Sequence, residues 1–471
     1  MHRVGRENEY KIFQKLYASN KSEFIAVFGR RRVGKTYLIR SFLNEYNCSF
    51  QVTGLSNASL AQQLFNFSNS LSKHTKQQVL ANNWLHAFQL LINYLENSTD
   101  KKKVVFIDEL PWFDTSKSNF IQALEHFWNS WASTRKDVML IVCGSAASWM
   151  IHKLINNTGG LHNRVTKKIK ISPFTLAECE AFLKMKNIPL DRYQIVQLYM
   201  VLGGIPFYWD EVEVGKSAAQ NIEQICFSEN GLLKTEFNNL YQSLFKNSVK
   251  HLIVVNQLAK KAKGLTREEI LNNTSLPNGG SSTRILEELE ESGFIRKYVP
   301  FGKNKRESLY QLSDFYTLFY FNFIQNSNLN DKNNWLNTID GPKQRAWSGY
   351  AYEQVCLYHI NQIKNALGIS GIETFTSAWR SKTSAVGAQI DLVIDRRDRV
   401  INLCEMKFSI NEFAIDKKYD ADLRNKIGTF KTETKTKKSV FLTMVTTFGL
   451  QQNAYAGLVQ NSITLNDLFN G

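Results

Sequence analysis

The amino-acid sequence predicts a multidomain α/β protein. At roughly 150 residues per domain, its 471 residues correspond to about three domains. Strand-sized apolar runs alternate with amphipathic helical stretches from Phe24 to about Ser172, which is typical of a domain with a largely parallel sheet. The same alternation returns after Trp347, so we expect a second α/β domain in the C-terminal part of the chain.

Composition limits the classes of protein that fit. Hydrophobic residues make up 43% of the chain and aromatic residues 12%, which excludes disorder as the main state. The net charge of +16 favours polyanionic partners such as nucleic acid or nucleotide phosphates. The six cysteines stand singly, which predicts buried thiols in a reducing compartment and no zinc site. No apolar run has the length of a membrane span or resembles a signal core, so we expect a cytoplasmic protein that does not enter a membrane.

The first domain, residues 1–174, contains the predicted parallel sheet. Its strand candidates are the runs FIAVFG, SFQVTG, VVFIDE, VMLIVCGS and KKIKIS, in that order. Helical stretches separate most of these runs, as the crossovers between parallel strands require.

Different patterns follow in the middle of the chain. Residues 175–246 have apolar residues at spacings of three and four, which predicts a helical lid subdomain. Residues 247–314 combine two helical stretches around a polar turn with two short strands joined by a basic turn, which is the layout of a winged helix. Residues 315–346 begin with the aromatic run DFYTLFYFNFI, which is too short to span a membrane and predicts buried docking helices. Residues 347–471 form the predicted C-terminal domain.

The sharpest motif is the segment GRRRVGKT, which follows the first strand and opens a helix. It matches GxxxxGK[ST], the P-loop, in the strand, loop and helix context that the motif requires. Backbone N–H groups at the helix N-terminus would surround the phosphates, Lys35 would reach the β/γ oxygens, and the Thr36 hydroxyl would bind Mg²⁺. The residues expected to contact the nucleotide here are Gly29, Arg30, Arg31, Arg32, Val33, Gly34, Lys35, Thr36 and Tyr37.

An acidic pair follows the run VVFI. Asp108 and Glu109 at the end of a buried strand match the Walker B arrangement, in which Asp108 would hold Mg²⁺ and Glu109 would polarise the attacking water. Asp108 could instead cap the next helix. The sequence therefore predicts ATP and Mg²⁺ as cofactors.

Two further residues are candidates for the γ-phosphate. Ser145 ends the run VMLIVCG, where its hydroxyl could act as a phosphate sensor or cap the following helix. Arg164 precedes the strand KKIKIS, where it could reach the γ-phosphate, reach the nucleotide of a neighbouring subunit, or lie in solvent.

These motifs together carry a resemblance. VGRENE, FGRRRVGKT, FIDEL, CGS, the Arg164 segment with ISPFTLAE, and GGIPFYW resemble the archaeal-type ATPase family, in the STAND branch of the AAA+ ATPases. The resemblance implies that Val4, Gly5 and Arg6 lie near the adenine, and that Pro206 of GGIP packs on the base. A Gly-Gly-Ile-Pro segment is also a physically adequate helix break, so a purely structural role for Pro206 stays open.

The sequence does not decide whether the predicted winged helix contacts DNA or protein. A winged helix binds DNA by placing its second helix in the major groove and its wing along the backbone. Here that helix, SSTRILEELEESG, carries four glutamates against Arg284, so only Arg284 and the wing residues Lys303, Lys305 and Arg306 suit a duplex. An intramolecular or protein contact is the other interpretation.

The last domain contains a possible hydrolytic site. Asp391 begins one predicted strand, and Glu405 and Lys407 end the next, so a hairpin would bring them to the same end. Two carboxylates can hold Mg²⁺ and a lysine can position water. This pattern resembles the restriction-endonuclease-like PD-(D/E)xK core, with Glu353 as a further metal ligand and the basic stretch 417–438 facing DNA; Gln389 and Ile390 stand where that motif has a proline. An inactive nuclease-like fold or an ordinary surface hairpin is the alternative.

Two functions remain open at this stage. In one, the nucleotide state controls a winged helix and a nuclease-like domain that acts on DNA. In the other, the protein is an ATP-driven signalling or assembly switch with an inactive nuclease-like domain, and its partner is another protein or a second copy of the chain.

Overall fold

The computed structural model describes residues 4–156, 159–245, 247–327, 335–381 and 387–470. The chain divides into two compact units, one up to Pro173 and one from Phe174 onward.

The first unit is built on a five-stranded parallel sheet. Its strands are β1 (Glu23–Phe28), β2 (Phe50–Thr53), β3 (Lys103–Asp108), β4 (Val138–Gly144) and β5 (Lys167–Lys170). They are ordered β2-β3-β4-β1-β5, so β4 lies between the strand that precedes the glycine loop and the strand that ends in Asp108. The predicted strands and their parallel pairing are confirmed.

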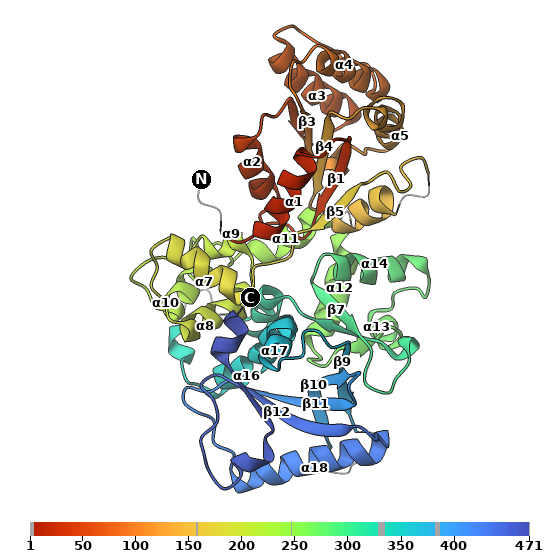
Figure 1. Ribbon diagram of the computed structural model, residues 1–471. Coiled ribbons are helices and arrows are strands. Elements are labelled where there is room, and N and C mark those ends of the chain that lie inside the picture. Colours follow the sequence, from red (N-terminus) through yellow and green to blue (C-terminus); the bar gives the residue numbers. More distant parts are fainter. Residues whose placement is uncertain (1–3, 157–158, 246, 328–334, 382–386, 471) are drawn as a thin grey trace. The chain divides into compact units, whose positions relative to one another are not determined.

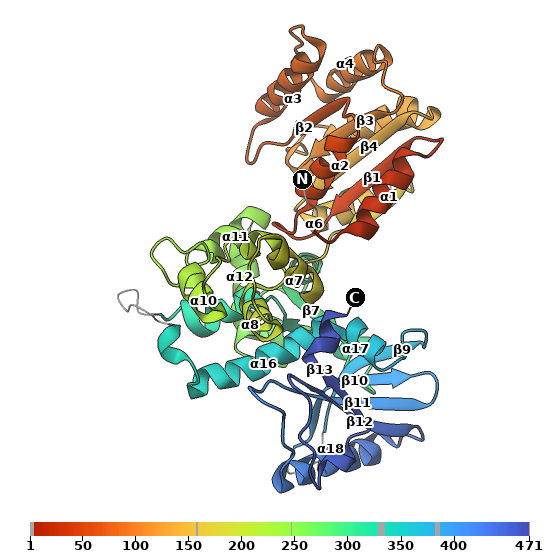
Figure 2. The ribbon, with the colours of Figure 1, turned by 60° about the vertical axis from the view of Figure 1, so that its left-hand side comes forward.

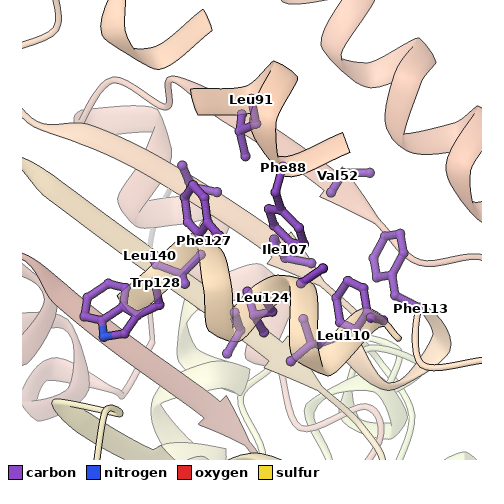
Figure 3. Packing of buried hydrophobic residues seen from close by; sticks show 14 of the residues in the cluster. Val52, Phe88, Leu91, Ile107, Leu110, Phe113, Leu124, Phe127, Trp128 and Leu140 are labelled. Atoms are coloured by element: carbon purple, nitrogen blue, oxygen red, sulfur yellow. The ribbon is translucent and has the colours of Figure 1, made fainter. Parts of the chain in front are cut away.

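Helices cover both faces of this sheet because its central strands are apolar on both sides. One face packs on α3 (Leu60–Thr75), α4 (Trp84–Glu96) and α5 (Phe120–His126), where Phe88, Phe127 and Trp128 contribute to a large buried cluster (Figure 3). On the other face, α1 (Glu7–Tyr17) packs against α2 (Lys35–Glu45), with the rings of Phe13 and Phe42 stacked 5.3 Å apart. The short helix α6 (Ala147–Trp149) follows β4.

The second unit begins with helices, as the sequence predicts for this region. They are α7 (Leu176–Met185), α8 (Arg192–Leu202), α9 (Pro206–Trp209), α10 (Ala218–Cys226) and α11 (Glu236–Leu244). The GGIP segment breaks the chain between α8 and α9, with Gly203 at φ 58° and Pro206 in the first position of α9. A Cβ on Gly204 would lie 1.9 Å from the carbonyl oxygen of Phe174, so only glycine fits there. The helix-break interpretation of this segment is confirmed.

The next segment combines three helices with a small antiparallel sheet. Its elements are α12 (Ser248–Ala259), β6 (Leu265–Thr266), α13 (Arg267–Thr274), α14 (Gly280–Glu291), β7 (Ile295–Tyr298) and β8 (Leu309–Leu312), with the sheet ordered β6-β8-β7. The helix α13 was not among the elements expected from the sequence. Its N-terminus is marked by a capping box in which Thr266 and Glu269 each accept a backbone N–H of the other residue.

The aromatic run forms a buried helix. It comprises α15 (Phe315–Phe319) and a π-helical turn over Tyr320–Ile324, and all of α15 is buried. This agrees with the predicted docking segment, of which residues 328–334 lie outside the described residues. None of the helices in the described part of the chain combines the length and apolar character needed to cross a bilayer.

The C-terminal part contains a second five-stranded sheet. Its helices are α16 (Pro342–Tyr358), α17 (Ile360–Ala366) and α18 (Lys417–Thr434), and its strands are β9 (Thr374–Arg380), β10 (Gln389–Arg396), β11 (Val400–Lys407), β12 (Ser439–Thr446) and β13 (Asn461–Thr464). The order is β13-β12-β11-β10-β9, with antiparallel pairing through β9, β10 and β11 and parallel pairing beyond β11. Figures 1 and 2 show α18 along one face of this sheet and α16 toward the other.

Candidate functional site

The glycine loop of the first unit joins β1 to α2 through a backbone that requires glycine at its start. Gly29 has φ 148°, and a Cβ on it would lie 2.2 Å from the carbonyl oxygen of Ile171. Gly34 ends the loop at φ 87° as the N-cap of α2, and no side chain caps that helix. The first N–H groups of α2 are therefore available to an anion at a helix N-terminus.

Lys35 lies inside this loop. Its side chain is 4% exposed, and its ammonium group donates to the carbonyl oxygens of Gly29 at 3.0 Å and Arg30 at 2.8 Å. Burial lowers the pKa of Lys35, while the neighbouring Cys143, Glu109 and Asp108 act in the opposite direction. This position inside the glycine loop would let the Lys35 side chain donate to a phosphate oxygen.

Thr36 and Asp108 meet across the gap between α2 and β3. The Thr36 hydroxyl lies 3.1 and 3.3 Å from the two carboxylate oxygens of Asp108, and Asp108 also accepts the backbone N–H of Glu109 at 3.0 Å. Burial, then the charge of Glu109, raises the pKa of Asp108. A hydroxyl and a carboxylate are oxygen donors that suit Mg²⁺, which would satisfy this buried charge.

Glu109 is held in one orientation by Ser145. Its carboxylate accepts the Ser145 hydroxyl at 2.6 Å and the Ser145 backbone N–H at 3.1 Å. The backbone of Glu109 is left-handed, with φ 47° and ψ 49°, a conformation that costs about 1–2 kcal/mol in a residue with a side chain. Because β4 lies beside β3, its end brings Ser145 to Glu109. The hydroxyl bonds to Glu109 and does not cap α6, whose N-cap is Ala146. This corrects the capping alternative.

The other predicted nucleotide contacts vary in burial. Arg30 and Val33 are buried, Arg31 and Arg32 are half-buried, and Tyr37 is 43% exposed.

The N-terminal motif lies at the edge of the same sheet. Val4 is half-buried, and Gly5 and Arg6 both have left-handed backbones, at φ 64° and 63°. The Arg6 guanidinium donates to the carbonyl of Ser172, which follows β5.

The last two predicted residues lie in different units. Arg164 is exposed in the turn before β5 of the first unit. Pro206 is half-buried in the second unit.

In the second unit, the hairpin of β10 and β11 forms as predicted. Leu392 pairs with Cys404 in an antiparallel register, which brings Asp391 and Glu405 to the same end. A register shift between Ile390 and Val393 places Asp391 at a β-bulge, a feature that re-aims side chains near functional sites.

The predicted metal ligands do not form a ready-made ion site. Glu405 accepts Lys426 at 2.6 Å and the Tyr419 hydroxyl at 3.0 Å, both from α18. Lys407 lies over the ring of Tyr419, 4.7 Å from its centre. Among the described residues, no group of three or more His, Cys, Asp or Glu side chains could hold a metal ion. The expected ligand set of Glu353, Asp391 and Glu405 is therefore not preassembled, because α18 takes up both oxygens of Glu405.

Glu353 and Asp391 nevertheless share one cavity of about 910 Å³. Burial, then the charge of Asp391, raises the pKa of Glu353 to about 8. Lys426, from the basic stretch 417–438 that was expected to face DNA, also lines this cavity. Five further lining residues come from the 260–311 segment: Lys260, Lys261, Lys263, Arg296 and Tyr298. No local motif marks them, because folding alone brings them to the carboxylates.

The first unit and the beginning of the second are similar to known ATPase domains. Residues 4–212 match the model of a family described as an ATPase domain predominantly from Archaea. An uncharacterized protein of Methanocaldococcus jannaschii is 24% identical over 330 residues, which are 68% of this chain and 68% of that protein. An uncharacterized ATP-binding protein of the same organism is 45% identical over 40 residues, which are 8% of this chain and 68% of that protein.

Among solved structures, the Walker-type ATPase of Pyrococcus abyssi has a similar fold. The TM-score is 0.50 at 16% identity, and the match covers 67% of this chain and 95% of that protein. At this identity the similarity concerns the fold.

Proposed function

We propose that the protein hydrolyses ATP with Mg²⁺ and that Glu109 is the general base, since residues 4–212 match the model of this family of ATPase domains. The observation that carries the proposal is the meeting of Lys35, Thr36, Asp108 and Glu109 at one edge of the parallel sheet. ATP phosphates would lie on the N–H groups of α2 and on the Lys35 ammonium.

The divalent ion would be held by the Thr36 hydroxyl and the Asp108 carboxylate, and when bound it neutralises charge on the phosphate oxygens. Glu109 accepts a proton from the attacking water. Its carboxylate is already fixed by the two donors of Ser145, so it needs little reorientation for that task.

Two variants test this assignment. Lys35→Ala should weaken ATP binding by roughly 10- to 150-fold, because it deletes a charge-assisted contact worth about 1.5–3 kcal/mol. Glu109→Gln should keep the affinity and lower turnover by about 100-fold or more. Unchanged binding and hydrolysis in Lys35→Ala would refute the site.

Arg164 provides a test for assembly. Its exposure on the turn before β5 is compatible with a contact to the nucleotide of a second copy. If Arg164→Ala lowers turnover, a mixture of the Arg164→Ala and Lys35→Ala proteins should regain activity only if Arg164 of one subunit acts on the nucleotide bound to another. Pro206, Val4, Gly5 and Arg6 are proposed adenine contacts on the basis of the family resemblance.

For the second unit we propose a nucleic-acid role controlled by the nucleotide state. The 247–314 segment would serve as a winged helix, and residues 347–471 as a nuclease-like domain with Asp391, Glu405 and Lys407 at its centre. What supports this is the β10–β11 hairpin, which brings the two carboxylates to one end beside Lys407. Both carboxylate oxygens of Glu405 already accept hydrogen bonds, from Tyr419 and Lys426. This favours the second candidate, an ATP-driven switch whose nuclease-like domain is inactive.

Cleavage assays separate the two candidates. Single- and double-stranded DNA and RNA would be incubated with Mg²⁺, with and without ATP, using the parent protein, Asp391→Ala and Lys407→Ala. Cleavage that disappears in both variants supports the nuclease. Absence of cleavage on every substrate supports the switch.

A further inference from the structure

The cavity that holds Glu353 and Asp391 is formed jointly by two parts of the second unit. The 260–311 segment contributes Lys263 and Arg296, and the C-terminal sheet and its helices contribute Arg380, Asp391 and Lys426. Two contacts fix these parts together beside the cavity. The backbone N–H of Phe301 donates to the carbonyl of Ala378 on β9 at 2.8 Å, and the ring of Phe301 lies 5.1 Å from that of Phe430 on α18.

The charge of the cavity favours an anion. Its lining includes the six cations Lys260, Lys261, Lys263, Arg296, Arg380 and Lys426 and the three carboxylates Glu269, Glu353 and Asp391. Burial, then the charge of Arg380, lowers the pKa of Lys263, while the charges of Asp391 and Glu353 act in the opposite direction. Lys263 and Arg380 therefore repel one another, and a phosphate bound between them would relieve this repulsion.

Aromatic residues are also present. Tyr298, Tyr350 and Trp379 line the same space. The Tyr298 hydroxyl donates to the carbonyl of Lys263 at 2.7 Å, which ties this aromatic side chain to a cationic part of the wall. Cationic groups interleaved with aromatic rings are the combination with which proteins bind single-stranded nucleic acid, because cations contact the backbone and bases stack on rings.

The size of the cavity suits a small ligand better than a duplex. A volume of about 910 Å³ lies near the upper end of the range of roughly 300–1,000 Å³ that is typical of small-molecule pockets. A duplex is instead bound by a protein element that protrudes into a groove about 12 Å wide. On α14, the element expected to do so, Glu288 accepts Arg284 of the same helix at 2.8 Å and bonds to His251 of α12 at 2.8 Å.

We propose that this cavity binds an unpaired end of a nucleic-acid strand, one or two nucleotides long, with Lys263 and Arg380 contacting its phosphates. The segment expected to be a winged helix then forms one wall of a single-strand site next to Asp391. This inference rests on the proposed nucleic-acid role of the second unit.

The test measures binding without cleavage. Fluorescence anisotropy with EDTA and saturating ADP would compare a single-stranded oligonucleotide, a hairpin with a single-stranded tail and a blunt hairpin. The parent should bind the first two probes at least about 10-fold more tightly than the blunt hairpin. Lys263→Ala/Arg380→Ala should lose about 10-fold in affinity for single strands and reduce the salt slope by about 1.4, the value for two phosphates on a single strand.

The control variant carries the same charge change outside the cavity. Lys343 and Arg345 on α16 are exposed cations of the same unit and are not part of the cavity lining. Lys343→Ala/Arg345→Ala should bind single strands like the parent. Preference for the blunt hairpin, equal losses in the two double variants, or no binding of any probe would overturn the inference. Binding as expected without cleavage in Mg²⁺ would instead remove only the proposed nuclease activity.

Discussion

Replacing Ser145 with alanine tests how Glu109 is positioned for hydrolysis. The substitution deletes the hydroxyl that donates to one carboxylate oxygen at 2.6 Å and leaves the backbone N–H that donates to the other at 3.1 Å. Glu109 would keep one of its two donors and gain rotational freedom. We therefore expect slower hydrolysis with unchanged ATP affinity.

The magnitude follows from the hydrogen bond that is lost. A bond to a charged group contributes about 1.5–3 kcal/mol, and each 1.36 kcal/mol in the barrier changes the rate tenfold. The remaining N–H donor retains part of the orientation, so the lower end of that range applies. We expect kcat to fall by about 10-fold, less than the roughly 100-fold or greater loss for Glu109→Gln.

The assay is a double-mutant cycle on steady-state ATP hydrolysis. If Ser145 acts through Glu109, adding Ser145→Ala to Glu109→Gln should cause little further loss, because the two changes then affect one function. If the Ser145 hydroxyl contacts the γ-phosphate itself, the two losses should multiply, and that result would refute the positioning role. Ser133→Ala removes an exposed hydroxyl that bonds only within its own segment, at 3.2 Å from the Asn129 carbonyl oxygen, and should leave the rate unchanged.

Two predictions concern the stability of the second unit. Gly204→Ala should lower the free energy of unfolding by about 1–3 kcal/mol, measured in urea, because the added methyl group would overlap the carbonyl of Phe174; an unchanged midpoint would contradict this. Burial lowers the pKa of His359 to about 4, and its neutral ring accepts the backbone N–H of Leu176 at 3.0 Å. The unfolded chain takes up this proton near its ordinary pKa of 6.5, so the stabilisation is complete above pH 6.5 and is lost as the pH falls toward 4, by up to about 3 kcal/mol. His359→Gln should flatten the acid side of the stability profile, and an equally steep profile in that variant would show that other groups cause it.

The core of the first unit could be predicted from the sequence because the patterns that predict it lie within short stretches of residues. Each strand is a short apolar run, and a P-loop motif occurs between a strand and a helix. The order β2-β3-β4-β1-β5 could not be predicted from such runs. That order brings Ser145 to Glu109, so the role of Ser145 depends on which strands lie beside β4.

The candidate site of the second unit was predictable only in part. Asp391 and Glu405 stand at the ends of adjacent strands, and the hairpin follows from the turn between them. The engagement of Glu405 by Lys426 depends on how α18 crosses the sheet, which no short motif encodes. Lys263 lies more than a hundred residues before Asp391, so its place in the same cavity depends on tertiary packing.

A physical route for nucleotide control follows from the extent of the family match. That match runs to residue 212 and so includes α7, α8 and α9, which belong to the unit that contains the cavity. On α8, Tyr193 stacks on Phe408 at 5.1 Å and on Phe448 at 5.6 Å, both in the C-terminal part. The last helices of the family match and the C-terminal part are therefore packed together through aromatic contacts.

Tyr193→Ala should uncouple the two parts. Each aromatic pair contributes about 0.5–1.5 kcal/mol, so losing both removes up to about 3 kcal/mol of the contact that would transmit a change in α8. If the nucleotide state alters oligonucleotide affinity by some factor, the oligonucleotide must alter nucleotide affinity by the same factor, and such factors are typically about 5- to 150-fold. We expect Tyr193→Ala to bring both factors toward one while ATP hydrolysis without oligonucleotide stays near the parent rate. Equal factors in the parent and the variant would show that the coupling does not pass through this contact.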